Sequence, residues 1–269
     1  MRAAFALLAL PVIGLVVQAA DPVRQAPSYS QSSIVNAASN LPGPLAPNTI
    51  GSLYGSDLAF VTRELRPEDI RDGSLPTLLS GTGVRVVVSR WPAQIFFVSP
   101  RQINFLVPAN LRPGQGDLQL VVDGRAGPLA PLRLDRAAPG LFELPGGFAV
   151  AIHGDGRIVS PESPASPGDV IVLFATGLGE TAPPALYGEV ARGPARLAPG
   201  VALDLEWDGR AAPPEDLLYA GLSPGFAGLY QINCRVPGFL AQGSGPASLR
   251  VRLDAASSQP DVKVSIRRQ

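Results

Sequence analysis

The sequence QINFLVP at residues 102–108 returns as QINCRVP at residues 231–237, and this pair determines the fold that we expect. In both segments apolar and polar side chains alternate, which is the period-two pattern of a half-buried β-strand. Phe105 and Cys234 hold the same inward position in the two copies. The pair therefore predicts two related β-units in one chain.

Further matches extend the repeat on both sides of this strand. IGSLYGSDL at residues 50–58 is matched by VIVLFATGL at residues 170–178, and VRVVV at residues 84–88 by LDLEW at residues 203–207. The two copies are offset by about 120 residues, which is too long for a solenoid repeat and suits a tandem domain.

The composition supports many short strands joined by turns. The chain has 29 glycines and 29 prolines in 269 residues, with 46% hydrophobic and 16% charged residues. Turn residues scattered among short apolar runs favour a sandwich or barrel. Asp208-Gly209 between two apolar runs predicts a type I′ hairpin, and Pro67–Ile70 predicts one helical turn. We expect an all-β fold of two tandem immunoglobulin-like β-sandwich domains related by internal duplication.

The N-terminus has the features of a secretory signal peptide. Met1-Arg2 is followed by an uncharged, mostly apolar stretch to Val17 and by small residues at a cleavage position, which predicts a signal peptide over residues 1–20. A membrane anchor is the alternative, but about 15 residues are short for a hydrocarbon core of about 30 Å. Residues 21–33 are expected to be a flexible leader, and no later stretch is apolar enough to span a membrane. The mature chain is expected to be secreted or associated with the cell surface.

The repeat also sets the domain boundaries. We expect the first sandwich at residues 34–136 and the second at residues 169–269. Residues 137–168 are rich in proline and are expected to form a linker, with a small β-hairpin that turns at Gly154-Asp155-Gly156.

Six motifs give the chain a family resemblance. It resembles a large uncharacterised family, the C-terminal domain abundant in exported proteins of Acidobacteria, over roughly residues 33–266. Each half also resembles, more loosely, the immunoglobulin-like domain of plexins and transcription factors (the IPT/TIG type). The resemblance implies secretion and a β-sandwich, and it carries no established activity, so no functional residue is transferred from it. The motifs are NAAS at 36–39, PRQINF at 100–105, APGLF at 138–142, PGDVIV at 167–172, ATGLG at 175–179 and SPGFAGLYQIN at 223–233.

Two sequence motifs of enzymes occur without the context that they need. GLSPG at residues 221–225 fits the G-x-S-x-G nucleophile elbow, but no helix is expected after it and the single histidine, His153, lies upstream. GLGETA at residues 177–182 resembles a dinucleotide fingerprint, but Pro183-Pro184 prevents the helix that would bind the pyrophosphate. We expect turns at both places, no cofactor and no enzyme.

Metal and nucleic-acid sites are not predicted. One histidine and Cys234 make no zinc cluster, and a lone cysteine makes no internal disulfide, so we expect a buried thiol. Calcium is an alternative at Asp155, Glu162 and Asp169, although a solvated loop is favoured. The 22 basic and 22 acidic residues form no basic stripe, so no nucleic-acid partner is expected.

The aromatic residues supply the candidate binding residues. Trp207 is expected in the core, whereas Trp91 follows a turn and could stack on a sugar or enter a partner's pocket, or else pack against the other half. Phe226 and Tyr230 lie in a loop at residues 222–230 that is longer in the second copy. End loops of sandwiches are common recognition sites. The predicted ligand or partner residues are therefore Trp91, Phe226 and Tyr230, and the predicted partner is an extracellular glycan or protein.

These observations favour an exported, non-catalytic binding or adhesion module. The first alternative is a structural spacer or envelope component without a ligand. The second is an extracellular hydrolase with an unrecognised site.

Overall fold

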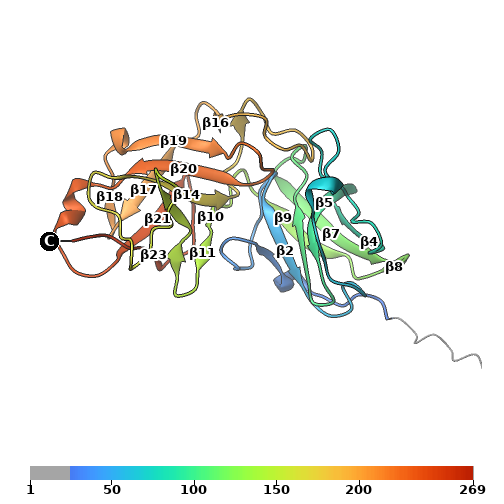
Figure 1. Cartoon of the computed structure of the whole chain (residues 1–269). Coiled ribbons are helices and arrows are strands. Elements are labelled where there is room, and N and C mark those ends of the chain that lie inside the picture. Colours follow the sequence, from blue (N-terminus) through green and yellow to red (C-terminus); the bar gives the residue numbers. More distant parts are fainter. Residues whose placement is uncertain (1–24, 269) are drawn as a thin grey trace, which may run out of the picture.

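The computed structural model describes residues 25–268, so the predicted signal peptide at residues 1–20 lies outside the described residues. The chain forms two β-lobes that lie side by side, the first blue to green and the second yellow to red (Figure 1). Helical structure in the described range is limited to the 3₁₀ turns Gln31–Ser33, Pro67–Asp69, Pro214–Asp216 and Gly238–Ala241. The predictions of an all-β fold and of a helical turn near residue 67 are confirmed. Across residues 25–268 there is no helix with the length and hydropathy needed to cross a bilayer.

The first lobe is a sandwich whose two layers share one strand. Strand β5 pairs through its first residues with β4, and through its later residues with β6. A bulge between Ile95 and Phe97 marks the change of register, and such irregularities bend a strand from one layer to the other. One layer contains β1, β2, β6 and β3, and the other contains β4, β7, β8 and β9. The strands are β1 (Ile34–Asn36), β2 (Ile50–Tyr54), β3 (Arg63–Glu64), β4 (Val84–Val88), β5 (Trp91–Val98), β6 (Gln102–Leu106), β7 (Gly114–Val122), β8 (Arg125–Ala126) and β9 (Ala130–Leu134).

The second lobe has two separate sheets around its own core. One sheet has the order β10-β14-β20-β19-β16-β15 with β13 beside β14, and the other has the order β11-β12-β23-β21-β17-β18 with β22 beside β21. The strands are β10 (Gly140–Leu141), β11 (Glu143–Leu144), β12 (Phe148–Ala149), β13 (Ala151–His153), β14 (Val170–Thr176), β15 (Thr181–Ala182), β16 (Ala195–Leu197), β17 (Leu203–Trp207), β18 (Arg210–Ala211), β19 (Leu217–Leu222), β20 (Tyr230–Arg235), β21 (Ala247–Leu253), β22 (Ala256–Ser257) and β23 (Val262–Val264).

The two lobes repeat the same pairings in the same register. Strands β2, β6 and β5 neighbour one another as β14, β20 and β19 do, and β4, β7 and β9 correspond to β17, β21 and β23. Because a slip of one residue would turn every side chain to the other face, equal register means that equivalent positions face equivalent cores. Matching pairs are Leu53–Ile103 with Leu173–Ile232, and Val88–Leu118 with Trp207–Leu249.

One equivalent pair has exchanged large and small residues. Gly51 lies opposite Phe105 in the first lobe, whereas Ile171 lies opposite Cys234 in the second. A Cβ atom at Gly51 would come within 2.7 Å of Phe105 Cζ, so the glycine is required by the ring. Each lobe thus pairs one large and one small residue here, but the large residue stands on β6 in the first lobe and on β14 in the second.

The predicted turns after the matching strands β4 and β17 are present. Asp208 and Gly209 have φ values of 49° and 75°, as a type I′ turn requires, and they join Trp207 to Arg210. In the first lobe Ser89 and Arg90 adopt φ values of 47° and 72° without a glycine. Trp207 and Cys234 are both fully buried, as predicted.

Two segments differ from the sequence-based expectation. The described part of the expected flexible leader is bound to the first sandwich, because the Tyr29 hydroxyl donates to the Pro128 carbonyl (2.6 Å) and accepts from the Leu120 N–H (2.7 Å). The expected linker at residues 137–168 supplies β10 to β13, which pair with β14 and β23, so this segment belongs to the second sandwich. Its small hairpin is present, with Ile152 opposite Ile158.

Candidate functional site

The two sandwiches are joined by buried hydrogen bonds. The Ile50 N–H donates to Thr176 Oγ1 (2.9 Å), and the Thr176 hydroxyl donates to the Gly228 carbonyl (2.7 Å). Thr176 is fully buried, so water does not compete for these bonds. Strand β2 of the first lobe is thereby hydrogen-bonded to β14, and through Thr176 it is linked to the loop before β20.

Tyr230 belongs to this joint, which corrects its prediction as a surface binding residue. The side chain is 0% exposed, and its hydroxyl donates to the Gly179 carbonyl (2.6 Å) and accepts from Asn48 Nδ2 (3.4 Å). Burial raises the pKa of Tyr230 to about 12. The ring therefore presents no exposed face, and its hydroxyl hydrogen-bonds Gly179 of the second lobe and Asn48 of the first.

An apolar cluster continues the joint. Its buried members are Leu75 and Leu106 from the first sandwich and Ala227 from the second, with Ile50, Phe96 and Val190 packed around them. Burial of apolar surface from both lobes adds a non-directional stabilisation to the hydrogen bonds. The lobes are therefore held as one body.

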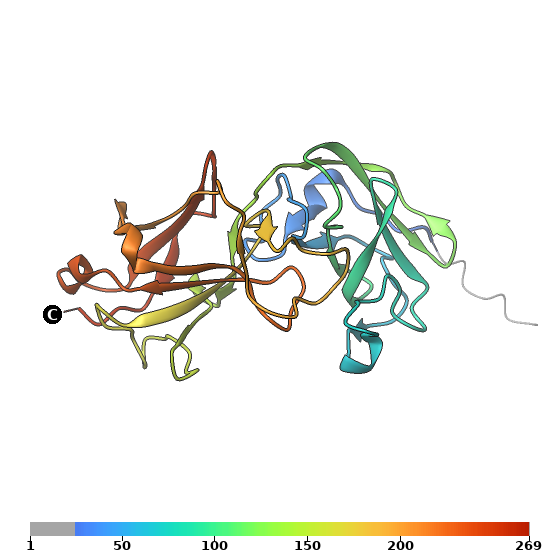
Figure 2. The same cartoon turned by 90° about the horizontal axis from the view of Figure 1, so that it is seen from above.

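A loop of the second lobe reaches across to the first. This bridging loop, residues 183–194, lies between the lobes in Figure 2, where it is yellow. The Leu75 N–H donates to the Gly188 carbonyl (2.8 Å), and the Val190 N–H donates to the Gly73 carbonyl (2.8 Å). Gly188 has a φ of 70°, and a Cβ atom there would lie 2.3 Å from Gln94 Nε2, so glycine is needed at this contact.

The bridging loop also fixes the exposed tryptophan. Trp91 begins β5, and its ring meets that of Tyr187 edge to face, with the centroids 5.7 Å apart and an interplanar angle of 61°. The Tyr187 hydroxyl donates to the Pro92 carbonyl, and burial raises the pKa of Tyr187. Trp91 nevertheless stays 46% exposed, so packing between the lobes and surface exposure occur at the same residue.

Phe226 lies beside the same loop and is also exposed. Its side chain is 54% exposed, and its carbonyl accepts the Ala191 N–H (2.9 Å). Two of the three predicted residues, Trp91 and Phe226, are thus surface residues that flank the bridging loop. The sequence analysis does not predict Tyr187 as a site residue, because it lies in a Pro- and Gly-rich stretch without strand periodicity. The one available signal is a tyrosine placed between turn residues.

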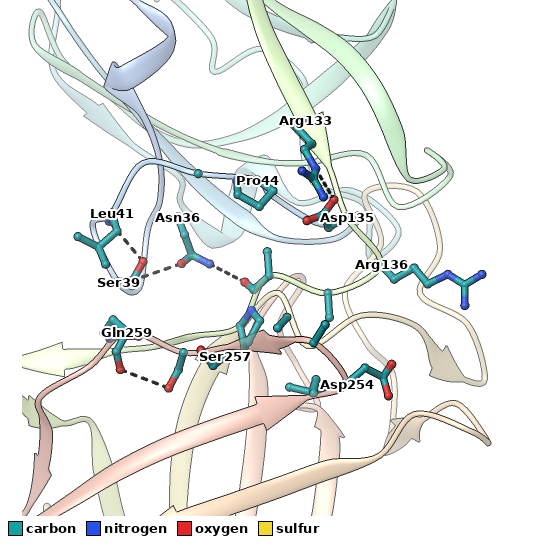
Figure 3. A pocket seen from close by; sticks show the side chains of 18 of the residues that line it. Asn36, Ser39, Leu41, Pro44, Arg133, Asp135, Arg136, Asp254, Ser257 and Gln259 are labelled. Atoms are coloured by element: carbon teal, nitrogen blue, oxygen red, sulfur yellow. Dashed lines mark hydrogen bonds and ion pairs between the residues drawn. The ribbon is translucent and has the colours of Figure 1, made fainter.

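Elsewhere on the joint, a cleft of about 760 Å³ opens between the lobes (Figure 3). Its walls come from residues 36–44, 113, 133–139 and 250–260. Asn36 braces one wall, since its Nδ2 donates to the Ala138 carbonyl (2.9 Å) and its Oδ1 accepts the Ala38 N–H (2.9 Å). Gln259 braces the other, bonding both backbone groups of Leu141. The side-chain amides of Asn36 and Gln259 thus already have hydrogen-bond partners within the protein.

The cleft is also lined by charged side chains. Arg133 is paired with Asp135 (2.8 Å). Arg136, Arg250 and Asp254 line the same cleft, and Figure 3 shows Arg136 and Asp254 toward one end of it. No aromatic ring is among the described residues that line this cleft.

The enzyme-like motifs form no catalytic arrangement in residues 25–268. The Ser223 hydroxyl donates to Gln231 Oε1 (3.1 Å), whereas His153 Nε2 lies 3.0 Å from the Ser163 carbonyl oxygen. A nucleophilic serine needs a base within hydrogen-bond reach, and His153 is engaged elsewhere.

The acidic residues considered for calcium are also engaged by neighbours. Asp155 accepts from the Arg157 side chain and Glu162 from the Ser160 hydroxyl, and these bonds lower the pKa of each carboxyl. Asp169 accepts the Ser166 N–H (2.7 Å). In the described range no group of three or more His, Cys, Asp or Glu residues could hold a metal ion.

Comparison with known proteins gives only distant likenesses. No family model matches the chain, and no curated protein matches it. Solved structures that it resembles include the SGBP-B protein of a Bacteroides ovatus mixed-linkage glucan utilization locus in complex with a heptasaccharide, at 11% identity and a TM-score of 0.35 over 93% of this chain and 46% of that one. SGBP-B from a xyloglucan utilization locus of Bacteroides uniformis is similar at 11% identity and a TM-score of 0.27, over 88% and 49%. Tandem immunoglobulin domains of titin are similar at 8% identity and a TM-score of 0.22, over 91% and 98%.

The chain spans about half the length of the two SGBP-B structures. At these TM-scores the likenesses carry no argument about a ligand. The description of the protein as two immunoglobulin-like β-sandwiches rests on its own sheet order and register.

Proposed function

We propose that the protein is an exported, non-catalytic module that binds extracellular glycans at the cell surface. The observation that carries this proposal is the exposed ring of Trp91, which Tyr187 holds at a fixed place on the joint. We name Trp91, Tyr187 and the neighbouring Leu186, which is 56% exposed, the aromatic patch.

The physical basis is the complementarity of a sugar ring and an indole. The face of an aromatic ring is electron-rich and attracts the polarised C–H groups on the apolar face of a pyranose. A rigid ring loses little conformational entropy on binding. Trp91 starts a paired strand and contacts Tyr187, so it is positioned in advance.

The export part of the proposal rests on the N-terminal sequence. Residues 1–20 have the charge, apolar stretch and small residues of a signal peptide. Expression of the full chain, followed by cell fractionation and N-terminal sequencing, tests this part. Recovery of the uncleaved chain in the cytoplasm would contradict it.

A glycan array with the mature chain tests the binding part. We expect binding to a set of neutral glycans, and we expect Trp91→Ala to weaken it at least tenfold, which corresponds to about 1.4 kcal/mol. Leu129→Ala is the matched control, because Leu129 is a surface side chain with 61% exposure that lies outside the aromatic patch. Equal binding by Trp91→Ala and by the unchanged chain would exclude the patch as the site.

A second candidate function is a rigid spacer without a ligand. The buried joint favours it, since the bonds around Thr176 and Tyr230 hold the lobes in one orientation. A spacer predicts a blank array together with an unchanged molecular envelope in Trp91→Ala by small-angle X-ray scattering. A positive array that depends on Trp91 favours the binding module instead.

A further inference from the structure

We infer that the outer face of one sheet in each lobe binds an extended, uncharged glycan chain, so that the protein carries two equivalent glycan-binding faces. Each face is formed by four half-buried side chains, which we name the outer quartet of that lobe. The quartets are Tyr54, Phe97, Gln102 and Asn104 in the first lobe, and Phe174, Tyr219, Gln231 and Asn233 in the second. They share no residue with the aromatic patch, so the inference goes beyond the proposed function.

The strand register brings the side chains of each quartet together. Every amide stands directly opposite an aromatic ring on a neighbouring strand. Directly opposed residues have their side chains on the same face of a sheet, with Cβ atoms about 4.5–5.5 Å apart. Each quartet is therefore a pair of amides with a ring on either side. The opposed pairs are Tyr54–Gln102, Phe97–Asn104, Phe174–Gln231 and Tyr219–Asn233.

Both quartets face away from the cores. Ile103 lies between the two amides of the first lobe and Ile232 between those of the second, and both isoleucines are fully buried. Because side chains alternate along a strand, the amides point to the opposite face. Among the hydrophobic clusters of the described residues, none includes a ring of either quartet. The half-buried rings thus remain available to a ligand.

A β-bulge at the same place in both lobes selects the second ring of each quartet. It lies between Ile95 and Phe97 in β5, and between Leu217 and Tyr219 in β19. Without the extra residue, Leu218 instead of Tyr219 would stand opposite Asn233. Bulges commonly re-aim a side chain beside a functional site.

The repeat has kept these amides while other positions of the same strand changed. QINFLVP and QINCRVP differ at two positions. Phe105 and Cys234 belong to the exchanged core pair, and Leu106 packs in the joint where its counterpart Arg235 is exposed. The glutamine and the asparagine are the same in both copies although they contact no core. A shared use of the outer face accounts for this.

The amides are fixed in place and still have donors to offer. In both lobes the glutamine Nε2 donates to the asparagine Oδ1, at 2.9 Å and 3.1 Å. A serine hydroxyl adds a second bond, from Ser52 to Asn104 (2.9 Å) and from Ser223 to Gln231 (3.1 Å). Within residues 25–268 the side-chain nitrogens of Asn104 and Asn233 have no hydrogen-bond partner. Each of these groups carries two N–H donors for a ligand.

The chemistry of the quartets selects an uncharged glycan. An aromatic face attracts the polarised C–H groups of a sugar ring, and amides both donate to and accept from hydroxyls. A lipid surface would leave the amides without hydrogen bonds. The central strands β6 and β20 are already paired on both sides, so a peptide cannot join them as a further strand.

Charge is not a shared property of the two faces. No carboxylate, ammonium or guanidinium group belongs to either quartet. At the margins, Glu64 stands opposite Phe97 in the first lobe, whereas the Arg196 guanidinium lies 5.0 Å from the centre of the Tyr219 ring in the second. Neighbours of opposite sign give the two faces no common preference for a charged polymer, so what they share is the recognition of neutral groups.

The spacing of the rings sets the length of the ligand. The two rings of a quartet lie on the strands at either side of the central strand and two residues apart along it. Strand spacings of about 4.8 Å and a rise of about 3.4 Å per residue place their Cα atoms about 12 Å apart. One pyranose ring is shorter than this distance. Each face therefore contacts several residues of an extended chain, and a monosaccharide reaches only part of it.

The test is an NMR titration of the Trp91→Ala protein, in which the aromatic patch no longer contributes. The probes are three uncharged β-1,4-linked hexasaccharides, of glucose, mannose and xylose, and the corresponding monosaccharides. We expect at least one hexasaccharide to shift the side-chain amide signals of both Asn104 and Asn233 saturably, and its monosaccharide to shift neither at equal concentration. Gln119, an amide on β7 in the other layer of the first lobe, is the matched control and should not respond.

Substitutions in one lobe separate the two faces. Tyr54→Ala with Phe97→Ala should weaken the response of Asn104 at least tenfold and leave that of Asn233 unchanged, and Phe174→Ala should act in the reverse sense. The signals of the unaltered lobe show in the same spectrum whether the variant is folded. If the ring variant does not fold, Gln102→Ala carries the same test with a smaller change.

Three results would overturn the inference: no response to any hexasaccharide, equal responses to hexasaccharide and monosaccharide, or ring variants that bind as the parent does. Shifts that appear in the unchanged chain but vanish in Trp91→Ala would also overturn it, and would leave the proposed function standing. Shifts that persist in Trp91→Ala, together with array binding that this substitution does not weaken, would support the quartets and count against the aromatic patch.

Discussion

The exchanged pair in the two cores leads to a double-mutant experiment. Gly51→Ile and Phe105→Cys together would give the first lobe the combination that the second lobe has at Ile171 and Cys234. Each change alone should destabilise the first sandwich. The double variant should be more stable than the sum of the two single effects implies.

The expected magnitudes follow from the contacts. Gly51→Ile places a Cβ atom 2.7 Å from Phe105 Cζ, in a core where Phe105 is fully buried. Overpacking of this kind costs about 1–3 kcal/mol or somewhat more. Phe105→Cys leaves a cavity, and truncation of a buried phenylalanine costs about 3–5 kcal/mol. In the double variant the isoleucine fills part of that cavity, so we expect a favourable coupling of about 2–3 kcal/mol, the upper range for residues in contact.

Urea unfolding of the four proteins gives the coupling directly. The chain has two tryptophans, Trp91 in the first lobe and Trp207 in the core of the second. Trp207→Phe variants leave Trp91 as the fluorescence probe of the first lobe. If Gly51→Ile does not fold, Gly51→Ala carries the same test with a smaller clash. Additive effects, with a coupling below about 0.5 kcal/mol, would refute the view that the two positions compensate for each other.

Three other predictions concern buried polar groups. Burial raises the pKa of Tyr230 to about 12, so the stability that the neutral Tyr230 side chain contributes is present at neutral pH and is lost as pH rises from about 10 to about 12. Thermal melts of Tyr230→Phe should lack this alkaline loss of stability. At pH 7 the same variant should be less stable by about 1–3 kcal/mol, because the Gly179 carbonyl is left unpaired. Burial, reinforced by Asp216, raises the pKa of Cys234 to about 12, so Ellman's reagent should not react at pH 8 until the chain is unfolded, and rapid native labelling would contradict this. Asn36→Ala should lower stability by about 1–3 kcal/mol in urea unfolding, because the carbonyl that this amide caps is left without its partner.

Much of the fold was predictable because the repeat and the strand period are local signals. The match of residues 102–108 with residues 231–237 predicted equivalent strands, and the structure gives them the same register against β2 and β14. Alternation also predicted the buried positions of Phe105 and Cys234. These features are encoded within a few neighbouring residues, so the chain alone reveals them.

The errors lie where distant segments meet. Short strands at residues 140–153 have no clear alternation, and they form only because β14 and β23 supply their partners. Tyr29 stands in a polar stretch, yet its hydroxyl finds the Leu120 N–H 91 residues away. Tertiary contacts of this kind override local composition.

The candidate site was predictable only in part for the same reason. Trp91 and Phe226 are exposed as expected, but Tyr230 enters the joint through Gly179 and Asn48, contacts that no spacing reveals. The cleft is assembled from four separate stretches of chain. Its existence depends on how the lobes meet, and periodicity within one lobe carries no information about that.

The buried joint has a consequence for how the protein can be divided. The first half produced alone would expose Leu106 to water and would leave the Ile50 N–H without its Thr176 acceptor. The second half produced alone would expose Ala227. Isolated halves should therefore aggregate, whereas two fragments split near residue 136 and synthesised together should reassemble without a covalent connection. The two halves of the repeat therefore depend on each other for their stability.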